Sequence, residues 1–401
     1  MPHPSRAVWA AVLLAAGPAS AFGLARFAYA VLLPPMQADL GWNYSTAALL
    51  NTVNAAGYLL GALVAARVGR RLGVRRAFLL SMVTTAVALG ASALSSLLPV
   101  LLVLRLIAGA TGAVTFILGA ALAASLASTH PERSSALLMG LYVAGGGLGI
   151  VVTGVLLPGA LAWFPAHLGW RIGWAVLGVV GILAWLMAAP AARRVPEPPP
   201  RPAGSRAPVR GMIPLLAGYT LFGAGYIAYM TFIVALLRAD GATDGQVSGF
   251  WIVLGLGAII GGFAWSPVIG RLSGGRAPAL LMVVVALGAG LPLIGSHPVL
   301  ALGSAVLFGG TFLALVGSVT HAARRVLDPS QVTDGIGTLT VGFAVGQSVG
   351  PILSGVLADS ADGVRAGLAL SVVVVLVGAV LFLGQRLHVP PVLASEHGPH
   401  P

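Results

Sequence analysis

Residues 67–76 read RVGRRLGVRR and separate two long apolar runs, at 46–66 and 77–97. Each run has about the 20 residues that a helix needs to cross the hydrocarbon core of a bilayer. Five arginines therefore gather in a ten-residue stretch between two candidate membrane helices. The pattern predicts a short basic loop on one side of a membrane, and it recurs along the chain.

Ten more apolar runs of similar length follow the same pattern, at 8–33, 99–125, 136–157, 171–190, 213–237, 246–269, 278–295, 299–322, 335–358 and 364–385. In lipid, only a helix or a closed barrel satisfies its own backbone, and the short alternating strands of a barrel are not seen. Ala19-Ser20-Ala21 imitates a signal-peptide cleavage site, but the run continues to Leu33. We therefore predict an all-α membrane protein with twelve transmembrane helices, the first included.

The composition supports this class. Hydrophobic residues make up 58% of the 401-residue chain and charged residues only 8%, whereas a soluble domain carries roughly 25% charged residues. The formal charge of +12 comes from arginines in short loops, which indicates membrane topology rather than nucleic-acid binding. The absence of cysteine excludes disulfides, a thiolate nucleophile and cysteine-ligated metal sites.

A Pro- and Arg-rich stretch at 193–210 divides the chain into two halves of equal length and is typical of a semi-rigid linker. We expect a six-helix half over 1–192, a second over 211–390 and a disordered tail over 391–401. With a cytoplasmic N-terminus, 17 arginines lie inside, three lie outside and two lie within spans. The positive-inside rule then predicts that the linker and both termini are on the cytoplasmic side of a bacterial inner membrane.

The two halves repeat each other in parallel orientation at an offset of about 200 residues. Gly57 aligns with Gly257, and Arg71-Leu72 aligns with Arg271-Leu272. A parallel repeat places a pseudo-twofold axis along the membrane normal and a solute site near the midplane. Matching glycines in the fifth and eleventh runs predict a bendable seam between the halves, formed by Gly145, Gly149, Gly346, Gly350 and Pro351.

These features resemble the major facilitator superfamily over the whole chain. The loop at 67–76 looks like the signature loop of that superfamily without its usual acidic residue, and the resemblance implies a gating role for Gly69, Arg70, Arg71, Gly73, Arg75 and Arg76. Within the superfamily, Arg26-Phe27-Ala28-Tyr29, Asn54-Ala55-Ala56-Gly57-Tyr58 and Gly346-Gln347 with Gly350-Pro351 are similar to the bacterial YbfB/YjiJ-type branch. The resemblance implies a transporter fold and a transport activity, but no substrate.

Arg26 and Arg105 are the ionisable residues that lie well inside predicted spans. A charge at a helix centre costs roughly 2.5 to 3.5 kcal/mol on insertion scales, which favours a functional role. Arg26 lies about 12 Å and Arg105 about 9 Å from the outer end of its helix, at 1.5 Å per residue. The resemblance places the first and fourth helices around one central cavity, so we expect both guanidinium groups there. In the alternative interpretation, Arg105 bonds neighbouring helix carbonyls and Arg26 snorkels outward.

Further polar and aromatic side chains at similar depth complete the predicted substrate site: Tyr29, Asn54, Tyr226, Tyr229, Trp251 and Gln347. A few convergent polar groups in a largely apolar pocket are what a small-molecule site needs. No histidine pair has metal-ligand spacing, and no span carries a nucleophile with a base. We therefore expect no metal, no cofactor and no catalytic residue.

The sequence favours a secondary transporter whose substrate carries a carboxylate or a similar anionic group. Two buried cations without buried anions need a counter-charge, which such a substrate supplies. The alternative is proton-coupled efflux of apolar or drug-like compounds, suggested by the glycines of the fifth run; a receptor or an enzyme is a further class. The expected partners are a small-molecule substrate, a co-transported or exchanged ion and the lipid bilayer, with no nucleic acid and a monomeric chain.

Overall fold

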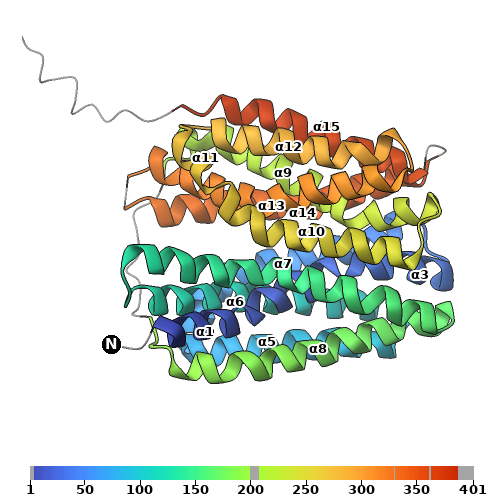
Figure 1. Ribbon diagram of the computed structural model, residues 1–401, viewed down its shortest axis with the longest axis horizontal. Helices are drawn as coiled ribbons and strands as arrows, with labels where there is room; N and C mark the ends of the chain where they lie inside the picture. Colours follow the sequence, from blue (N-terminus) through green and yellow to red (C-terminus); the bar gives the residue numbers. More distant parts are fainter. Residues whose placement is uncertain (1–3, 199–206, 329, 361–362, 387–401) are drawn as a thin grey trace, which may run out of the picture.

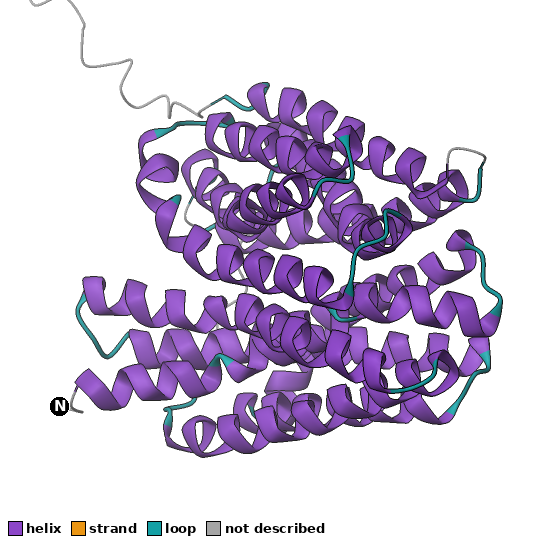
Figure 2. Ribbon diagram, turned by 45° about the vertical axis from the view of Figure 1, so that its right-hand side comes forward, coloured by secondary structure: helices purple, strands orange, loops and turns teal. Residues whose placement is uncertain are grey.

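A computed structural model describes residues 4–198, 207–328, 330–360 and 363–386. Over these residues the chain is helical and carries no strand (Figure 2). Twelve of its helices are long and apolar enough to cross a membrane, as predicted. The expected tail at 391–401 and residues 199–206 of the linker lie outside the described residues.

The first span, Arg6–Leu40, is irregular. It consists of α1 (Pro4–Leu14), α2 (Ala16–Pro18), the π-helix η1 (Ala19–Phe27) and α3 (Tyr29–Leu40). It continues seven residues beyond the predicted end at Leu33, through Pro34 and Pro35. The two prolines remove backbone donors, but the side chains from Tyr29 to Leu33 are buried and hold the helix in place. Gly41, at a φ of 65°, ends it in the left-handed conformation.

The remaining spans of the first half are α4 (Tyr44–Leu72), α5 (Val74–Ala91) with the short η2 (Ser92–Leu94), α6 (Leu98–Ala127), α7 (Glu132–Trp163) and α8 (Ala166–Arg194). The second half begins at η3 (Val209–Met212) and contains α9 (Ile213–Ala239), α10 (Asp244–Ala264) with α11 (Ser266–Arg271), α12 (Arg276–Ile294), α13 (Pro298–Val326), α14 (Val332–Ala358) and α15 (Gly363–Leu383).

The helices form two layers, with α1 to α8 below and α9 to α15 above in the view of Figure 1. We call the end of the bundle that holds residue 4 the terminal end and the other the opposite end. Among the described residues, hydrogen bonds between the two halves lie from the middle of the bundle to its opposite end. Toward the terminal end, the ribbons of the two layers separate. The structure is therefore closed at the opposite end.

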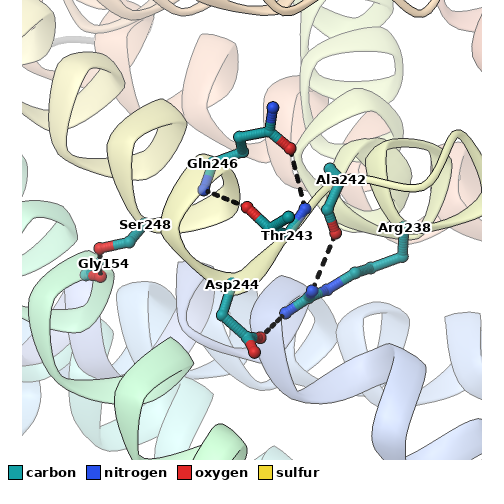
Figure 3. A network of polar contacts seen from close by, with 7 residues as sticks. All are labelled: Gly154, Arg238, Ala242, Thr243, Asp244, Gln246 and Ser248. Atoms are coloured by element: carbon teal, nitrogen blue, oxygen red, sulfur yellow. Dashed lines mark hydrogen bonds and ion pairs between the residues drawn. The ribbon is translucent and has the colours of Figure 1, made fainter.

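At the opposite end of the bundle, polar groups cap the helix ends, as expected where helices meet water. In the turn between α9 and α10, Thr243 and Gln246 form a reciprocal capping box (Figure 3). Arg238 closes this turn by donating to the carbonyl of Ala242 and to the carboxylate of Asp244. One turn into α10, the hydroxyl of Ser248 donates to Gly154 O of α7 at 2.6 Å and so joins the two halves.

The outer surface of the bundle is apolar. Large hydrophobic side chains such as Leu63, Val179 and Ile260 are more than 60% exposed in the interior of their spans. A contiguous surface of this kind is unfavourable in water and fits the hydrocarbon core of a bilayer. The chain is therefore a multi-pass membrane protein, as expected.

Candidate functional site

Arg26 lies in the last turn of the π-helix η1 and is buried, with 2% of its surface exposed. Ala28 N donates to Gly23 O at 2.9 Å, a bond that spans five residues rather than four. π-Helical turns are rare and occur frequently at functional sites. This irregular turn places the guanidinium group of the first half beside helices of the second half.

A chain of hydrogen bonds joins Arg26 to the second half. Arg26 Nη2 donates to Gln347 Oε1 at 2.5 Å, and Gln347 Nε2 donates to the hydroxyl of Tyr226. Arg26 Cζ also lies 5.2 Å from the ring centroid of Tyr58 on α4, which is a cation–π distance. The three residues Arg26, Tyr226 and Gln347 were predicted as site residues, and the structure brings them together.

One nitrogen of Arg26 remains unpaired. Its Nη1 atom is buried and has no hydrogen-bond partner among the described residues. Arg26 and Arg105 are the charged residues in the buried set, so no buried carboxylate among the described residues balances either of them. A buried charge without a partner is costly. The arrangement therefore suits a ligand that accepts hydrogen bonds and carries negative charge.

Arg105 lies next to Arg26, and each of its guanidinium nitrogens donates to a protein group. Its Nη1 donates to Ala25 O at 2.5 Å, its Nη2 to Asn51 Oδ1 at 3.0 Å and its Nε to Leu50 O at 3.4 Å. Its Cζ is also within 5.5 Å of the ring centroids of Tyr29 and Trp174. Ala25, whose carbonyl accepts from Arg105 Nη1, directly precedes Arg26, so the two arginines lie close together. Three of the five guanidinium N–H groups of Arg105 are bonded to protein, and its contact with an anion shared with Arg26 stays a prediction.

Tyr29 and Asn54 support this arrangement from within the first half. The hydroxyl of Tyr29 donates to Ala47 O at 2.8 Å, and Asn54 Nδ2 donates to Arg105 O at 3.1 Å. Both side chains are buried and both bonds end on backbone carbonyls. The structure therefore gives these two predicted residues packing contacts around Arg105 rather than free polar groups.

Tyr229 and Trp251 bond elsewhere. Tyr229 pairs with Ser304 inside the second half, and Trp251 Nε1 donates to Thr153 Oγ1 at 3.0 Å, where α10 packs against α7. Within the described residues, neither side chain is hydrogen-bonded to Arg26, Gln347 or Tyr226. Their hydroxyl and indole groups are already paired with protein partners.

The glycines predicted as a seam between halves make contacts inside each half. A Cβ on Gly149 would lie 2.5 Å from Ala19 O of the first span, and Gly145 is pressed against Ala15 in the same span. Gly346 and Gly350 pack in the same way against the backbone of α9. The seam prediction is therefore wrong for these four positions, although their role in helix packing holds. Pro351 follows Gly350 within α14.

Other glycines make the contacts between halves. A Cβ on Gly147 would lie 2.7 Å from Gly255 O of α10, and one on Gly355 would lie 2.9 Å from Tyr44 O. Small residues let membrane helices approach closely. The repeat pattern predicted close packing, but it did not reveal which glycines face the partner half.

The predicted gating loop contains Gly69, Arg70, Arg71, Gly73, Arg75 and Arg76, and it turns at Gly73, whose φ is 81°. The start of the linker contacts this loop. Arg75 Nη2 donates to Val195 O at 3.0 Å, and Arg75 N donates to Glu197 Oε1 at 3.3 Å. Glu197 therefore places a carboxylate beside a signature loop that lacks its own acidic residue.

Sequence reasoning missed Asn51, Tyr58 and Thr231. Asn51 Nδ2 donates to Thr231 Oγ1 at 2.7 Å and so connects Arg105 to α9 of the other half. A signal was present, because Asn51, Asn54 and Tyr58 are spaced three and four residues apart and share one face of α4. Thr231 carries no such pattern and is found only in the folded chain.

Comparison with known proteins identifies the fold. The chain is similar to a bacterial homolog of the human lysosomal transporter Spinster in an inward-facing, unoccupied conformation (16% identity, 95% of this chain, 96% of that chain, TM-score 0.72). It is also similar to a mutant of the nucleoside transporter NupG (12% identity, 93% of this chain, 99% of that chain, TM-score 0.75). A third similar structure is that of the human organic anion transporter MFSD10, or TETRAN (18% identity, 95% of this chain, 100% of that chain, TM-score 0.65). These identities show the fold alone. No curated protein matches the chain.

A family model gives a closer assignment. Residues 18–383 match the family described as uncharacterised MFS-type transporter YbfB, which covers all but the ends of the chain. The match includes the twelve spans except the start of the first. The chain therefore belongs to this family of the major facilitator superfamily and is a membrane transporter rather than an enzyme.

Proposed function

We propose that this protein is a secondary active transporter of a small organic anion and that Arg26 holds the anionic group. The observation that carries the proposal is the buried Nη1 of Arg26, which has no partner among the described residues. A carboxylate accepts the paired N–H groups of a guanidinium in two parallel hydrogen bonds. It would supply both the acceptor and the counter-charge that Arg26 lacks.

Gln347, Tyr226 and Tyr58 surround the proposed binding group. Gln347 already accepts from Arg26 Nη2 and donates to Tyr226, so it fixes the orientation of the guanidinium plane. Tyr58 covers one face of that plane. Arg26 and Tyr58 come from the first half, whereas Gln347 and Tyr226 come from the second. An anion bound here contacts both halves, which alternating access requires of a substrate site.

Transport by alternating access also needs an orientation. We propose that both termini, the loop at 67–76 and the linker are cytoplasmic in a bacterial inner membrane, because the arginines concentrate at this end of the bundle. The terminal end is then the inner end, and the end at which hydrogen bonds join the halves is the outer end. A monomer is sufficient, since both walls of the site come from one chain.

The efflux alternative has less support. Proton-coupled export of a cation calls for a carboxylate in the membrane interior to hold the proton or the cargo. Among the described residues, the buried charged side chains are arginines. Two of the α7 glycines that suggested export, Gly145 and Gly149, pack against the first span of their own half.

The test is binding and uptake by variants of Arg26 in proteoliposomes. Arg26→Ala is expected to abolish uptake of a monocarboxylate, whereas Arg26→Lys keeps the charge, loses the two-pronged contact and binds weakly. Removing one partner of a desolvated charge pair costs about 2 to 5 kcal/mol, or about 30-fold to several thousand-fold in affinity. Arg324→Ala serves as the control, because Arg324 is exposed near the end of α13. Equal binding by wild type and Arg26→Ala would refute the proposal.

A further inference from the structure

We propose that the anion is an aromatic monocarboxylate whose flat ring lies between two clusters of aromatic side chains, one from each half of the transporter. This inference rests on the proposed function, since it assigns the body of the molecule whose charged group binds Arg26. It uses rings that the anion proposal leaves without a role.

The first aromatic cluster belongs to the first half and consists of Phe22, Tyr58, Phe116 and Tyr142. The ring centroids of Phe22 and Phe116 are 4.8 Å apart in an edge-to-face arrangement, and those of Phe22 and Tyr58 are 6.0 Å apart. Phe116 stacks on Tyr142 at 6.1 Å. Four different helical segments, η1, α4, α6 and α7, supply these rings. Tyr58 also carries the cation–π contact to Arg26.

The second aromatic cluster belongs to the second half and consists of Tyr219, Phe222, Tyr226 and Phe343. Phe343 stacks on Tyr219 at 4.4 Å with an interplanar angle of 11°, and on Tyr226 at 5.5 Å with an angle of 7°. Phe222 stacks on Tyr226 at 4.9 Å. Three rings from one helix, α9, and one from α14 therefore lie nearly parallel. Such a set presents flat π surfaces rather than the branched surface of an ordinary apolar core.

Arg26 lies between the two clusters. It contacts Tyr58 of the first directly and reaches Tyr226 of the second through Gln347. Two further rings connect the clusters: Phe27 stacks on Phe22 at 6.2 Å and meets Phe312 edge-to-face at 5.8 Å, and Phe312 stacks on Tyr226 at 6.1 Å. The unpaired nitrogen of Arg26 is thus enclosed by aromatic groups from both halves.

Some of these rings are accessible and others are fully packed. Tyr58, Tyr219 and Tyr226 are buried, whereas Phe22 and Phe343 are only partly buried. Phe22 lies beside Gly146, and so does Leu313 of α13 from the other half, which places Phe22 at the junction of the halves. One accessible ring in each half can therefore meet a ligand that enters between them.

The chemistry of the site favours a ligand with one negative charge and a flat ring. Each guanidinium nitrogen of Arg105 already donates to a protein group, whereas the buried Nη1 of Arg26 has no partner among the described residues, so one carboxylate of the ligand is assigned to Arg26. An aromatic ring gains from stacked and edge contacts that a puckered aliphatic ring of similar size cannot make. Each such contact adds about twofold to tenfold in affinity beyond burial of apolar area.

The experiment compares three probes on purified protein in lipid nanodiscs: benzoate, cyclohexanecarboxylate and benzamide. The first two share charge and approximate size and differ in the flat ring, and the third keeps the ring and loses the charge. Apparent Kd values come from the dependence of the thermal unfolding midpoint on probe concentration. Benzoate is expected to bind at least about fivefold more tightly than cyclohexanecarboxylate and at least about 30-fold more tightly than benzamide.

Two variants test the rings themselves. Phe22→Leu and Phe343→Leu are each expected to weaken benzoate binding by about twofold to tenfold and to leave cyclohexanecarboxylate binding unchanged. Phe164→Leu is the matched control, because Phe164 is an exposed ring at the far end of α7. It is expected to change neither value.

The outcomes separate this inference from the proposed function. Equal binding of benzoate and cyclohexanecarboxylate, both lost in Arg26→Ala, would refute the aromatic inference and keep the anion proposal. Benzamide binding as tightly as benzoate, or benzoate binding equally well to Arg26→Ala, would refute both. Binding of none of the three probes would overturn the aromatic assignment.

Discussion

Asp359 holds the two halves together at the opposite end of the bundle. It follows the last residue of α14 in the second half, and its carboxylate accepts from Tyr44 N at 2.6 Å and from Ser45 N at 3.1 Å. These are the first two amides of α4 in the first half, where the helix leaves donors unsatisfied and the helix dipole favours negative charge. The carboxylate therefore caps a helix of the other half, and opening this end must break both bonds.

The expected effect of Asp359→Ala follows from that geometry. Asp359 is exposed, so water replaces the lost acceptor and screening reduces the value of its charge. Replacing a helix-capping side chain by Ala costs about 0.5 to 2 kcal/mol. With about 1.4 kcal/mol per factor of ten, the population open at this end should rise about twofold to 30-fold. Asp359→Asn keeps one acceptor oxygen and should give an intermediate increase.

The absence of native cysteines makes the assay direct. A cysteine introduced at Ala48, which is fully buried beside Gly355, reports opening through its rate of alkylation by a membrane-impermeant maleimide. The rate should rise by the same factor in Asp359→Ala. A cysteine at Gly159, which is exposed with open space around it, gives the intrinsic reactivity at this end. An alkylation rate at position 48 that Asp359→Ala does not change would refute the capping argument.

Three further perturbations test other parts of the structure. Arg105→Ala should lower folded yield and stability by about 3 kcal/mol or more, measured by thermal unfolding, because Ala25 O, Leu50 O and Asn51 lose their donor; a fully stable variant with lost binding would instead make Arg105 a substrate ligand. Gly149→Ala and Gly350→Ala should reduce both stability and uptake, because a methyl group would overlap the backbones of the first span and α9, whereas Gly262→Ala has open space and should behave as wild type. Reporter fusions at Arg210 and at the C-terminus should both indicate the cytoplasm, and a periplasmic signal from either would overturn the proposed orientation.

The fold was predictable because its main physical determinant is local. Each span can be recognised from its own run of about 20 apolar residues, without knowledge of the helices around it. The twelve predicted runs correspond to the twelve spans of the structure. The exception within the first span shows the limit of this reasoning. The first apolar run was predicted to end at Leu33, but the helix continues through Pro34 and Pro35 to Leu40, with the residues before the prolines buried.

The candidate site was predictable only in part, because its geometry depends on which helix faces which. Arg26, Tyr226 and Gln347 share a depth in the membrane, and depth can be counted along a helix at 1.5 Å per residue. The rotation of each helix about its axis decides which neighbour a side chain at that depth contacts. Trp251 lies at a suitable depth but turns toward Thr153 of α7, and Gly149 turns toward its own half. No spacing in the sequence distinguishes these orientations.

The difference between the two buried arginines comes from backbone irregularity. At the junction of η1 and α3, the helix changes from bonds that span five residues to bonds that span four. Ala25 O lies at this junction and accepts from Arg105 Nη1. Arg105 therefore bonds the irregular turn that carries Arg26, whereas Arg26 Nη1 has no partner among the described residues. We therefore propose that the two arginines have successive roles, in which Arg105 positions the π-helical turn and Arg26 binds the anion.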